Sequence, residues 1–167
     1  MALFVNEYEY TTDIISESIA AWWGKKFRNG YISMGICILI SLGLFLLRKR
    51  LIYLLLGLLS ILLIVLFKVK EKRSVKLEQE RMKVLYRDAV PIIRVEIDED
   101  IYTSTNKRES RISFSDVENV VETKNLIVLF IKGSMTVALD KKGFTSGNAD
   151  ECISYLKAHI NRKGMDK

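Results

Sequence analysis

The stretches YISMGICILISLGLFLL (Tyr31–Leu47) and LIYLLLGLLSILLIVLF (Leu51–Phe67) lie back to back, separated by Arg48-Lys49-Arg50. Each is 17 residues long and contains no charged residue, histidine or proline. A helix of this length is about 26 Å long, close to the ~30 Å hydrocarbon core of a bilayer. The pattern therefore predicts two membrane spans joined by a short cationic turn.

Two other arrangements of these stretches are less favourable. One continuous helix would hold three cations near the bilayer centre, at about 2.5–3.5 kcal/mol each, whereas a hairpin places them in water. A helical hairpin buried in a soluble core is the second alternative, but both stretches are apolar on all sides rather than along one stripe. We therefore expect a transmembrane helical hairpin at residues 31–67.

Positive charge at the ends of the spans predicts their orientation. Nine cations flank the outer ends, at Lys25, Lys26, Arg28, Lys68, Lys70, Lys72, Arg73, Lys76 and Arg81, against three in the turn. Because cationic flanks remain in the cytoplasm, we expect a two-span, multi-pass protein of the cell membrane with both termini cytoplasmic. The candidate residues at the membrane interface are Trp22, Trp23, Lys25, Lys26, Arg28, Arg48, Lys49, Arg50, Lys68 and Lys70.

The basic excess is confined to the half of the chain that would touch the membrane. Residues 1–90 hold 14 Lys and Arg against 8 Asp and Glu, whereas residues 91–167 hold 12 of each, so the whole net charge of +6 lies in the first part. This distribution favours membrane lipids with anionic headgroups as partners. It argues against a nucleic-acid partner, which would need a basic face on the soluble part.

No constellation of residues indicates catalysis or cofactor binding. The single histidine, His159, has neither a carboxylate nor a nucleophile placed near it by sequence, and Cys37 and Cys152 are too far apart in the expected fold to share a metal or form a disulfide. The cluster Asp98-Glu99-Asp100 is explained by a tight turn, and the phosphate-loop spacing is absent. We expect no enzymatic activity, no cofactor and no metal.

The segments beside the spans have their own patterns. Residues 2–10 alternate and lack Gly and Pro, which predicts a strand, and a helix is expected from about Asp13 to Arg28 after a cap at Thr11 or Thr12. Its apolar stripe, with Trp23 and Phe27, either lies at the lipid headgroups or packs on the soluble domain, and the pattern leaves both open. Residues 68–90 are highly charged and read as a helical stalk.

From residue 92 onward the hydrophobic period becomes two, which predicts strands. Leu126–Ile131 is apolar throughout, so it is expected to be either a central strand buried on both faces or an edge strand covered by a helix. A capping-box pattern at residues 115–118 predicts one helical turn, and an i, i+3, i+4 stripe after Asn148 predicts a final helix. The expected strands are residues 92–97, 101–105, 110–114, 119–123, 126–132 and 135–140.

These elements predict a membrane α+β protein. Its domains would be residues 1–30 (strand and amphipathic helix), 31–67 (hairpin), 68–90 (stalk) and 91–167 (β-rich domain with a C-terminal helix), the last completed by residues 2–10. Seven mostly antiparallel strands closed by one C-terminal helix form the plan of a pleckstrin-homology-like β-barrel.

Two segments of the C-terminal part resemble a known family. Residues 112–123, ISFSDVENVVET, and residues 137–144, VALDKKGF, together with the strand and helix of Phe4–Phe27 and the two-span hairpin, are similar to the YcxB-like family of bacterial membrane proteins. The resemblance implies a membrane-bound bacterial protein with a cytoplasmic domain of pleckstrin-homology-like type. It implies no known activity, substrate or catalytic residue.

The function expected from these features is that of a non-enzymatic, membrane-anchored binding or regulatory module. Its soluble domain would present a face to a protein partner or to lipid headgroups. The alternative is a structural or immunity-type membrane subunit that acts through its transmembrane hairpin.

Overall fold

The computed structural model describes residues 2–87, 89–105, 108–133 and 135–164. The chain divides into two compact units. Residues 22–77 form a helical hairpin, and residues 1–21 together with residues 78–167 form a second unit, which we call the headpiece. The headpiece is therefore assembled from the two ends of the sequence.

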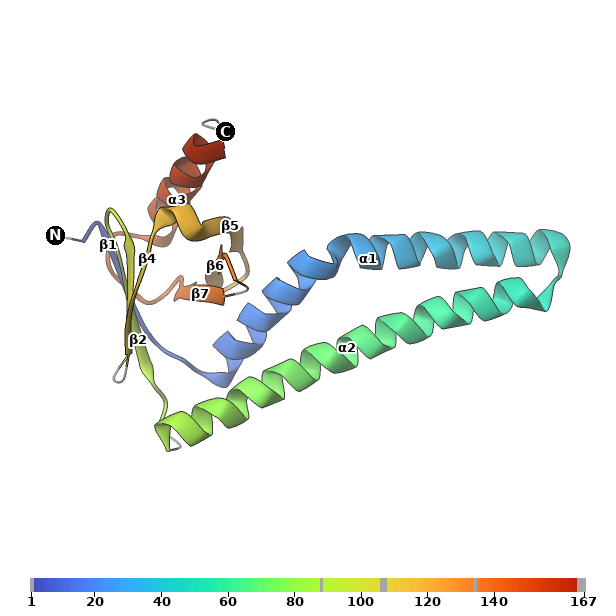
Figure 1. The fold of residues 1–167 in the computed structure, drawn as a ribbon, viewed down its shortest axis with the longest axis horizontal. Coiled ribbons are helices and arrows are strands. Elements are labelled where there is room, and N and C mark those ends of the chain that lie inside the picture. The colour runs from blue at the N-terminus through green and yellow to red at the C-terminus, as the bar shows by residue number, and fades with distance from the viewer. Residues whose placement is uncertain (1, 88, 106–107, 134, 165–167) are drawn as a thin grey trace. The chain divides into compact units, whose positions relative to one another are not determined.

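Two long helices, α1 (Thr12–Arg48) and α2 (Leu51–Tyr86), provide the hairpin and run antiparallel (Figure 1). The chain reverses at Lys49, whose φ of 50° lies in the left-handed region. The helices approach closely at a small-residue contact, where a Cβ added to Gly57 would lie 3.6 Å from the Ser41 Cβ. Ser41 and Ser60 are among the buried residues of the hairpin.

The apolar parts of α1 and α2 are exposed. Both helices are long and apolar enough to cross a membrane, yet only 6% of each apolar window is buried within the chain. A core helix of a soluble protein has the opposite pattern, with its apolar side chains covered. The two helices therefore have the length and the exposed apolar surface that membrane spans require.

Helix α1 is longer than the sequence pattern predicts. The helix expected at residues 13–28 does not end before the first apolar stretch but continues through it to Arg48. Helix α2 continues past the second stretch to Tyr86, over most of the range in which a helical stalk was expected. Neither junction contains proline, and Gly24 and Gly30 keep helical backbone angles, so each helical hydrogen-bond ladder has no reason to break there.

The strands of the headpiece form two antiparallel sheets. One has the order β4-β3-β2-β1-β8 and the other the order β5-β6-β7. Their bounds are β1 (Phe4–Glu9), β2 (Ile92–Ile97), β3 (Ile101–Thr105), β4 (Arg108–Ile112), β5 (Val117–Glu122), β6 (Leu126–Ile131), β7 (Met135–Asp140) and β8 (Phe144–Ser146). The N-terminal strand β1 lies inside the larger sheet, in register with β2 from Phe4 opposite Ile97 to Glu9 opposite Ile92.

Three details differ from the sequence expectation. The barrel is not closed by strand pairing, because the described strands divide between two sheets. An unexpected strand, β8, follows a turn at Gly143 and pairs with β1. The helical turn is a 3-10 turn, η1 (Phe114–Asp116), whose cap is Ser113 rather than Ser115, because the Ser113 side chain accepts the hydrogen bond from the Ser115 N–H.

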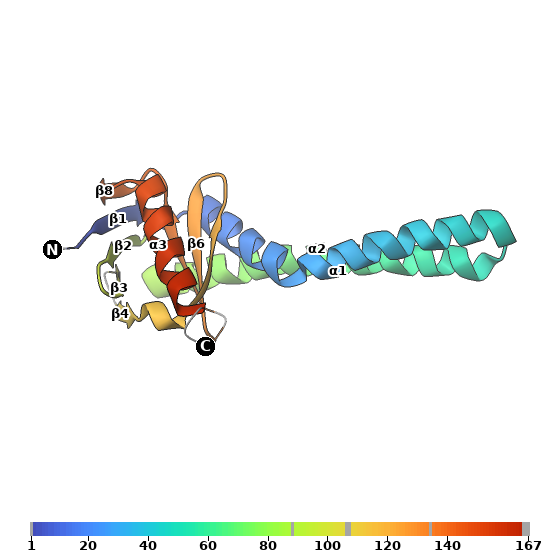
Figure 2. The same cartoon turned by 90° about the horizontal axis from the view of Figure 1, so that it is seen from above.

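The core of the headpiece lies around β6, which is buried at every position from Leu126 to Ile131, as predicted. The C-terminal helix α3 (Ala149–Gly164) is visible in Figure 2. It packs against β5 and η1, and its Cys152 and Leu156 are fully buried. On α3, Tyr155 contacts the ring of Phe4, and its hydroxyl donates to the Asp98 carbonyl oxygen at 3.1 Å. The helix thus touches strands from both ends of the chain.

The side chain of a buried asparagine joins the two sheets between β1 and β7, which are not paired by backbone hydrogen bonds. Asn6 on β1 is 1% exposed. Its Nδ2 donates to the Asp140 carbonyl oxygen at 2.7 Å, and its Oδ1 accepts from the Asp140 N–H at 3.0 Å. The side-chain amide therefore takes the place of a peptide group and pairs β1 with the end of β7.

Replacing Asn6 with Asp is expected to lower the free energy of unfolding by about 2–3 kcal/mol, because a near-isosteric carboxylate cannot donate to the Asp140 carbonyl oxygen. Thermal unfolding of the headpiece measures the effect. Glu7→Gln, an exposed change on the same strand, is the control and should leave stability within about 0.5 kcal/mol of the parent. Equal stability of the Asn6→Asp and Glu7→Gln proteins contradicts the bridging role.

Candidate functional site

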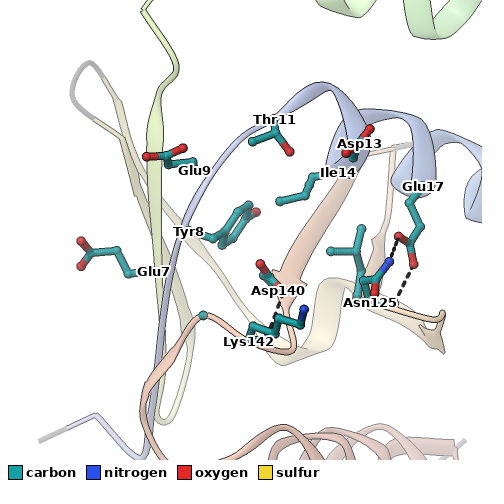
Figure 3. Close-up of a pocket in the computed structure, with 12 residues that line it drawn as sticks. Glu7, Tyr8, Glu9, Thr11, Asp13, Ile14, Glu17, Asn125, Asp140 and Lys142 are labelled. Carbon is teal, nitrogen blue, oxygen red and sulfur yellow. Dashed lines mark hydrogen bonds between the residues drawn. The ribbon is translucent and has the colours of Figure 1, made fainter.

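The headpiece contains a cleft of about 540 Å³ at the junction of β1, the start of α1 and the end of β7 (Figure 3). We call it the acidic cleft, because five of its lining residues carry carboxylates. Its lining residues are Glu7, Tyr8, Glu9, Thr11, Asp13, Ile14, Glu17, Asn125, Leu126, Asp140, Lys142 and Gly143. All of them belong to the headpiece.

The first turn of α1 and the adjoining end of β1 supply most of the negative charge. Glu9 ends β1, and Asp13 lies in the first turn of α1, where the helix dipole favours a carboxylate. Among the described residues, neither Glu9 nor Asp13 forms an ion pair within 4 Å. These two carboxylates are therefore available to a cationic group that enters the cleft.

Glu17 has a structural role at the edge of the cleft. Its carboxylate accepts hydrogen bonds from the Thr123 hydroxyl at 2.5 Å, from the Asn125 N–H at 2.8 Å and from the Asn125 side-chain amide at 2.9 Å. Burial opposes ionisation of Glu17, but these hydrogen bonds outweigh it and lower the pKa of the carboxyl group. Glu17 thus fixes the turn between β5 and β6 to the first turns of α1.

Replacing Glu17 with Gln is expected to destabilise the headpiece by about 1–2 kcal/mol at neutral pH, because charge-assisted hydrogen bonds to the β5–β6 turn are lost. A lowered pKa means that the carboxylate stabilises the fold above the ordinary Glu pKa of 4.5 and that this stability is lost as the pH falls through the lowered value. The difference between the parent and variant proteins should therefore shrink below about pH 4.5. Chemical denaturation at pH 7 and pH 3 tests this, and a difference that stays constant contradicts it.

Tyr8 and Gly143 form the inner part of the cleft. Tyr8 is buried, and its hydroxyl donates to the Ala138 carbonyl oxygen at 2.7 Å, while burial raises the pKa of the phenol above its usual range. Gly143 allows its loop to approach β1, because a Cβ at this position would lie 2.6 Å from the Glu7 carbonyl oxygen. This part of the cleft is therefore closely packed and uncharged, and the carboxylates belong to the other lining residues.

The chemistry that this arrangement can support is recognition of positive charge. Among the described residues, no group of three or more His, Cys, Asp or Glu side chains is placed to hold a metal ion. The cleft offers carboxylates, a threonine hydroxyl and one ammonium group at Lys142. These groups suit hydrogen bonds and ion pairs with lysine or arginine side chains.

The residues predicted for the membrane interface lie at the two ends of the hairpin. Near its headpiece-proximal end, Lys26 Nζ lies 4.3 Å from the ring centroid of Trp22, and Trp23 stacks on Phe27 at 4.8 Å. Lys68 follows the second apolar stretch and pairs with Glu71 at 2.8 Å. Arg48, Lys49 and Arg50 form the turn at the far end, while Lys25, Arg28 and Lys70 are exposed along the helices.

Trp22, Trp23, Phe27 and Tyr31 of α1 and Phe67 of α2 form an aromatic cluster near Lys26 and Lys68. The Phe67 ring of α2 lies 4.9 Å from Phe27 and 6.1 Å from Tyr31, both on α1. The sequence pattern identified the tryptophans but assigned Phe67 to the apolar span alone. A group of aromatic residues beside lysines is typical of the headgroup level of a membrane.

Sequence reasoning missed the acidic cleft. Glu7 and Glu9 alternate with Tyr8, so a strand pattern places them on the exposed face of β1, and Asp13 is readily explained by the helix start. The cleft forms only because the turn at residues 140–143 lies against β1. No local pattern in the sequence connects segments more than 130 residues apart.

The fold defines a class of protein in which a long apolar hairpin is inserted into a small headpiece of two antiparallel sheets and a C-terminal helix. Within this fold, residues 97–156 match the family model described as YcxB-like protein. The match runs from the end of β2 into α3 and includes both motifs on which the resemblance rests, so the predicted family is confirmed over these residues. A comparison with curated proteins finds no match.

Proposed function

We propose that this protein is a non-enzymatic binding module anchored in the cell membrane by its hairpin. The apolar stretches at residues 31–67 cross the bilayer twice, both termini are cytoplasmic, and the headpiece performs a pleckstrin-homology-like binding role. The observation that carries the proposal is the exposed apolar surface of α1 and α2, whose headpiece-proximal ends both continue into one folded unit.

The two charged regions of the molecule suit different partners. Lys26 and Lys68, which lie over the rings of Trp22 and Tyr31, suit anionic lipid headgroups. The acidic cleft repels such headgroups and suits a basic segment of a protein. We therefore propose membrane lipids as partners of the hairpin ends and a protein partner for the headpiece.

A photo-crosslinking residue at Thr11, inside the cleft, tests the proposed protein partner in cells that produce the full chain. A discrete adduct should form at Thr11, and the double change Glu9→Gln and Asp13→Asn should abolish it. Lys132, exposed and outside the cleft, is the matched control position. The absence of an adduct at Thr11, or an equal one at Lys132 that resists charge removal, overturns the proposal.

A second candidate is a structural or immunity-type subunit that acts through the hairpin. It is favoured by an apolar groove of about 210 Å³ between the helices near the far turn, lined by Ile38, Ser41, Leu42, Phe45, Tyr53, Leu54, Gly57, Leu58 and Ile61. Exchanging residues 31–67 for an unrelated two-span hairpin separates the candidates. The Thr11 adduct should survive the exchange if the headpiece acts and disappear if the spans select the partner.

A further inference from the structure

Strand β4 is the edge of the larger sheet. Among the described strands it pairs with β3 alone, in a register that places Ser110 opposite Thr103. Residues Arg108 to Arg111 are all exposed. An unpaired edge presents backbone N–H and C=O groups that can add a strand from another chain.

Hydrogen bonds from β3 show which backbone groups point away from the sheet. The Thr103 hydroxyl donates to the Ser110 carbonyl oxygen at 3.4 Å, and the Thr105 hydroxyl donates to the Arg108 carbonyl oxygen at 3.3 Å. The carbonyl groups of Arg108 and Ser110 therefore face β3. Because these directions alternate along a strand, the backbone groups of Glu109 and Arg111 face outward.

This alternation limits how β4 can pair with a second copy of itself. In an antiparallel pair, the backbone groups of two opposed residues point either toward each other or away from each other. Two neighbouring residues of β4 point in opposite directions, so they cannot lie opposite each other. The two-fold axis of a symmetric pair must therefore pass through a single residue that lies opposite its own copy. A centre at Glu109 opposes two carboxylates, and a centre at Arg111 opposes two guanidinium groups. A centre at Ser110 places Glu109 of each copy opposite Arg111 of the other, which gives two favourable pairs.

We propose that β4 of two copies pairs antiparallel with Ser110 at the two-fold axis, which joins two headpieces through one continuous sheet. Glu109 and Arg111 would then exchange backbone hydrogen bonds and form the cross-strand ion pairs. Within its own chain, the Nε and Nη2 groups of Arg111 contact Asp100 Oδ2 at 2.7 and 2.5 Å. A guanidinium group has five N–H donors, so donors remain for the carboxylate of a second copy.

The expected interface between two β4 strands is small, and confinement to a membrane offsets the weak association that this implies. Pairing of two five-residue strands buries much less than the about 1,200 Å² typical of stable interfaces, so association of free headpieces should be weak. Confinement of two chains to one membrane raises their effective concentration. The inference rests on the membrane anchoring of the proposed function, but it requires neither the acidic cleft nor a foreign partner.

Cysteine cross-linking in membranes that contain the full chain tests the register. Opposed residues whose backbone groups point away from each other lie about 4.5 Å apart at Cα, within the range of a disulfide. With Cys37 replaced by Ala and the buried Cys152 retained, Ser110→Cys should give a disulfide-linked dimer on oxidation. Glu109→Cys and Arg111→Cys should not do so alone but should cross-link when co-expressed. No dimer from Ser110→Cys, or an equal yield from Glu109→Cys, overturns the proposal.

Charge reversal provides an independent readout of the same pair. In the Ser110→Cys background, Glu109→Arg or Arg111→Glu alone opposes like charges twice and should lower the dimer yield at least about fivefold. Co-expression of these two variants places opposite charges at both pairs and should restore the yield. Unchanged thermal unfolding of each variant excludes misfolding as the cause. Yields that do not respond to charge, in variants that remain folded, overturn the proposed register.

Discussion

Deleting residues 2–10 is expected to unfold the headpiece, although the whole C-terminal β-rich segment remains. Strand β1 lies between β2 and β8 and contributes three inward side chains, Phe4, Asn6 and Tyr8. Burial of two aromatic side chains alone stabilises a fold by about 3–6 kcal/mol, and the bridge from Asn6 is lost as well. This approaches the total stability of a small domain, which is about 5–15 kcal/mol.

Protease resistance of the segment from β2 to α3 measures this effect in the full-length protein. The parent should give a resistant fragment that spans the headpiece strands, and the deletion variant should be digested throughout that region. A variant with Glu7→Gln and Glu9→Gln keeps β1 while changing only exposed residues and is the matched control. A resistant headpiece in the deletion variant contradicts assembly from both ends of the chain.

Replacing residues 22–77 with a flexible Gly/Ser linker of about 12 residues is expected to transfer nearly all of the protein from the membrane fraction to the aqueous fraction. The exposed large apolar residues are concentrated in the hairpin, whereas the headpiece core is internal. Removal of the hairpin therefore removes the surface that requires lipid. Fractionation of cell extracts without detergent measures the transfer.

The linker variant also tests whether the headpiece is a domain of its own. Its unfolding midpoint should match that of the headpiece in the full chain, since the contacts of Asn6, Tyr8 and Glu17 all lie within the retained residues. Asn6→Asp in this variant should reproduce the destabilisation expected in the full chain. A linker variant that stays with the membrane, or that unfolds at a much lower temperature, contradicts the division into two units.

Periodicity predicted the elements well because each element has a strong local signal. The uncharged stretches predicted the hairpin, the alternation of residues 2–10 predicted β1, and the apolar run at Leu126 predicted the buried β6. The family resemblance, supported by the sequence around residues 112–123, was confirmed over residues 97–156. Element ends were less accurate: Ser113 rather than Ser115 caps the 3-10 turn, and the helix end expected at Arg28 is absent because α1 continues to Arg48.

Arrangement between distant segments was harder to predict. The strands would close into a barrel only if backbone hydrogen bonds paired β1 with β7. In the structure, the side chain of Asn6 bonds to the Asp140 backbone in place of such pairing. A lone asparagine in a strand carries no sequence signal for that role. The acidic cleft was missed for the same reason, because its carboxylates look like ordinary surface residues until the loop at Gly143 lies against β1.

In the proposed topology, the hairpin crosses a bilayer and returns both ends of the chain to one side. Labelling of single cysteines with a membrane-impermeant maleimide in intact spheroplasts, with Cys37 replaced by Ala, tests this topology. A cysteine at exposed Lys49 should be labelled at once, whereas cysteines at exposed Leu3 and Lys157 should be labelled only after lysis. Labelling of Leu3→Cys and Lys157→Cys from opposite sides, or protection of all three positions until lysis, rules this topology out.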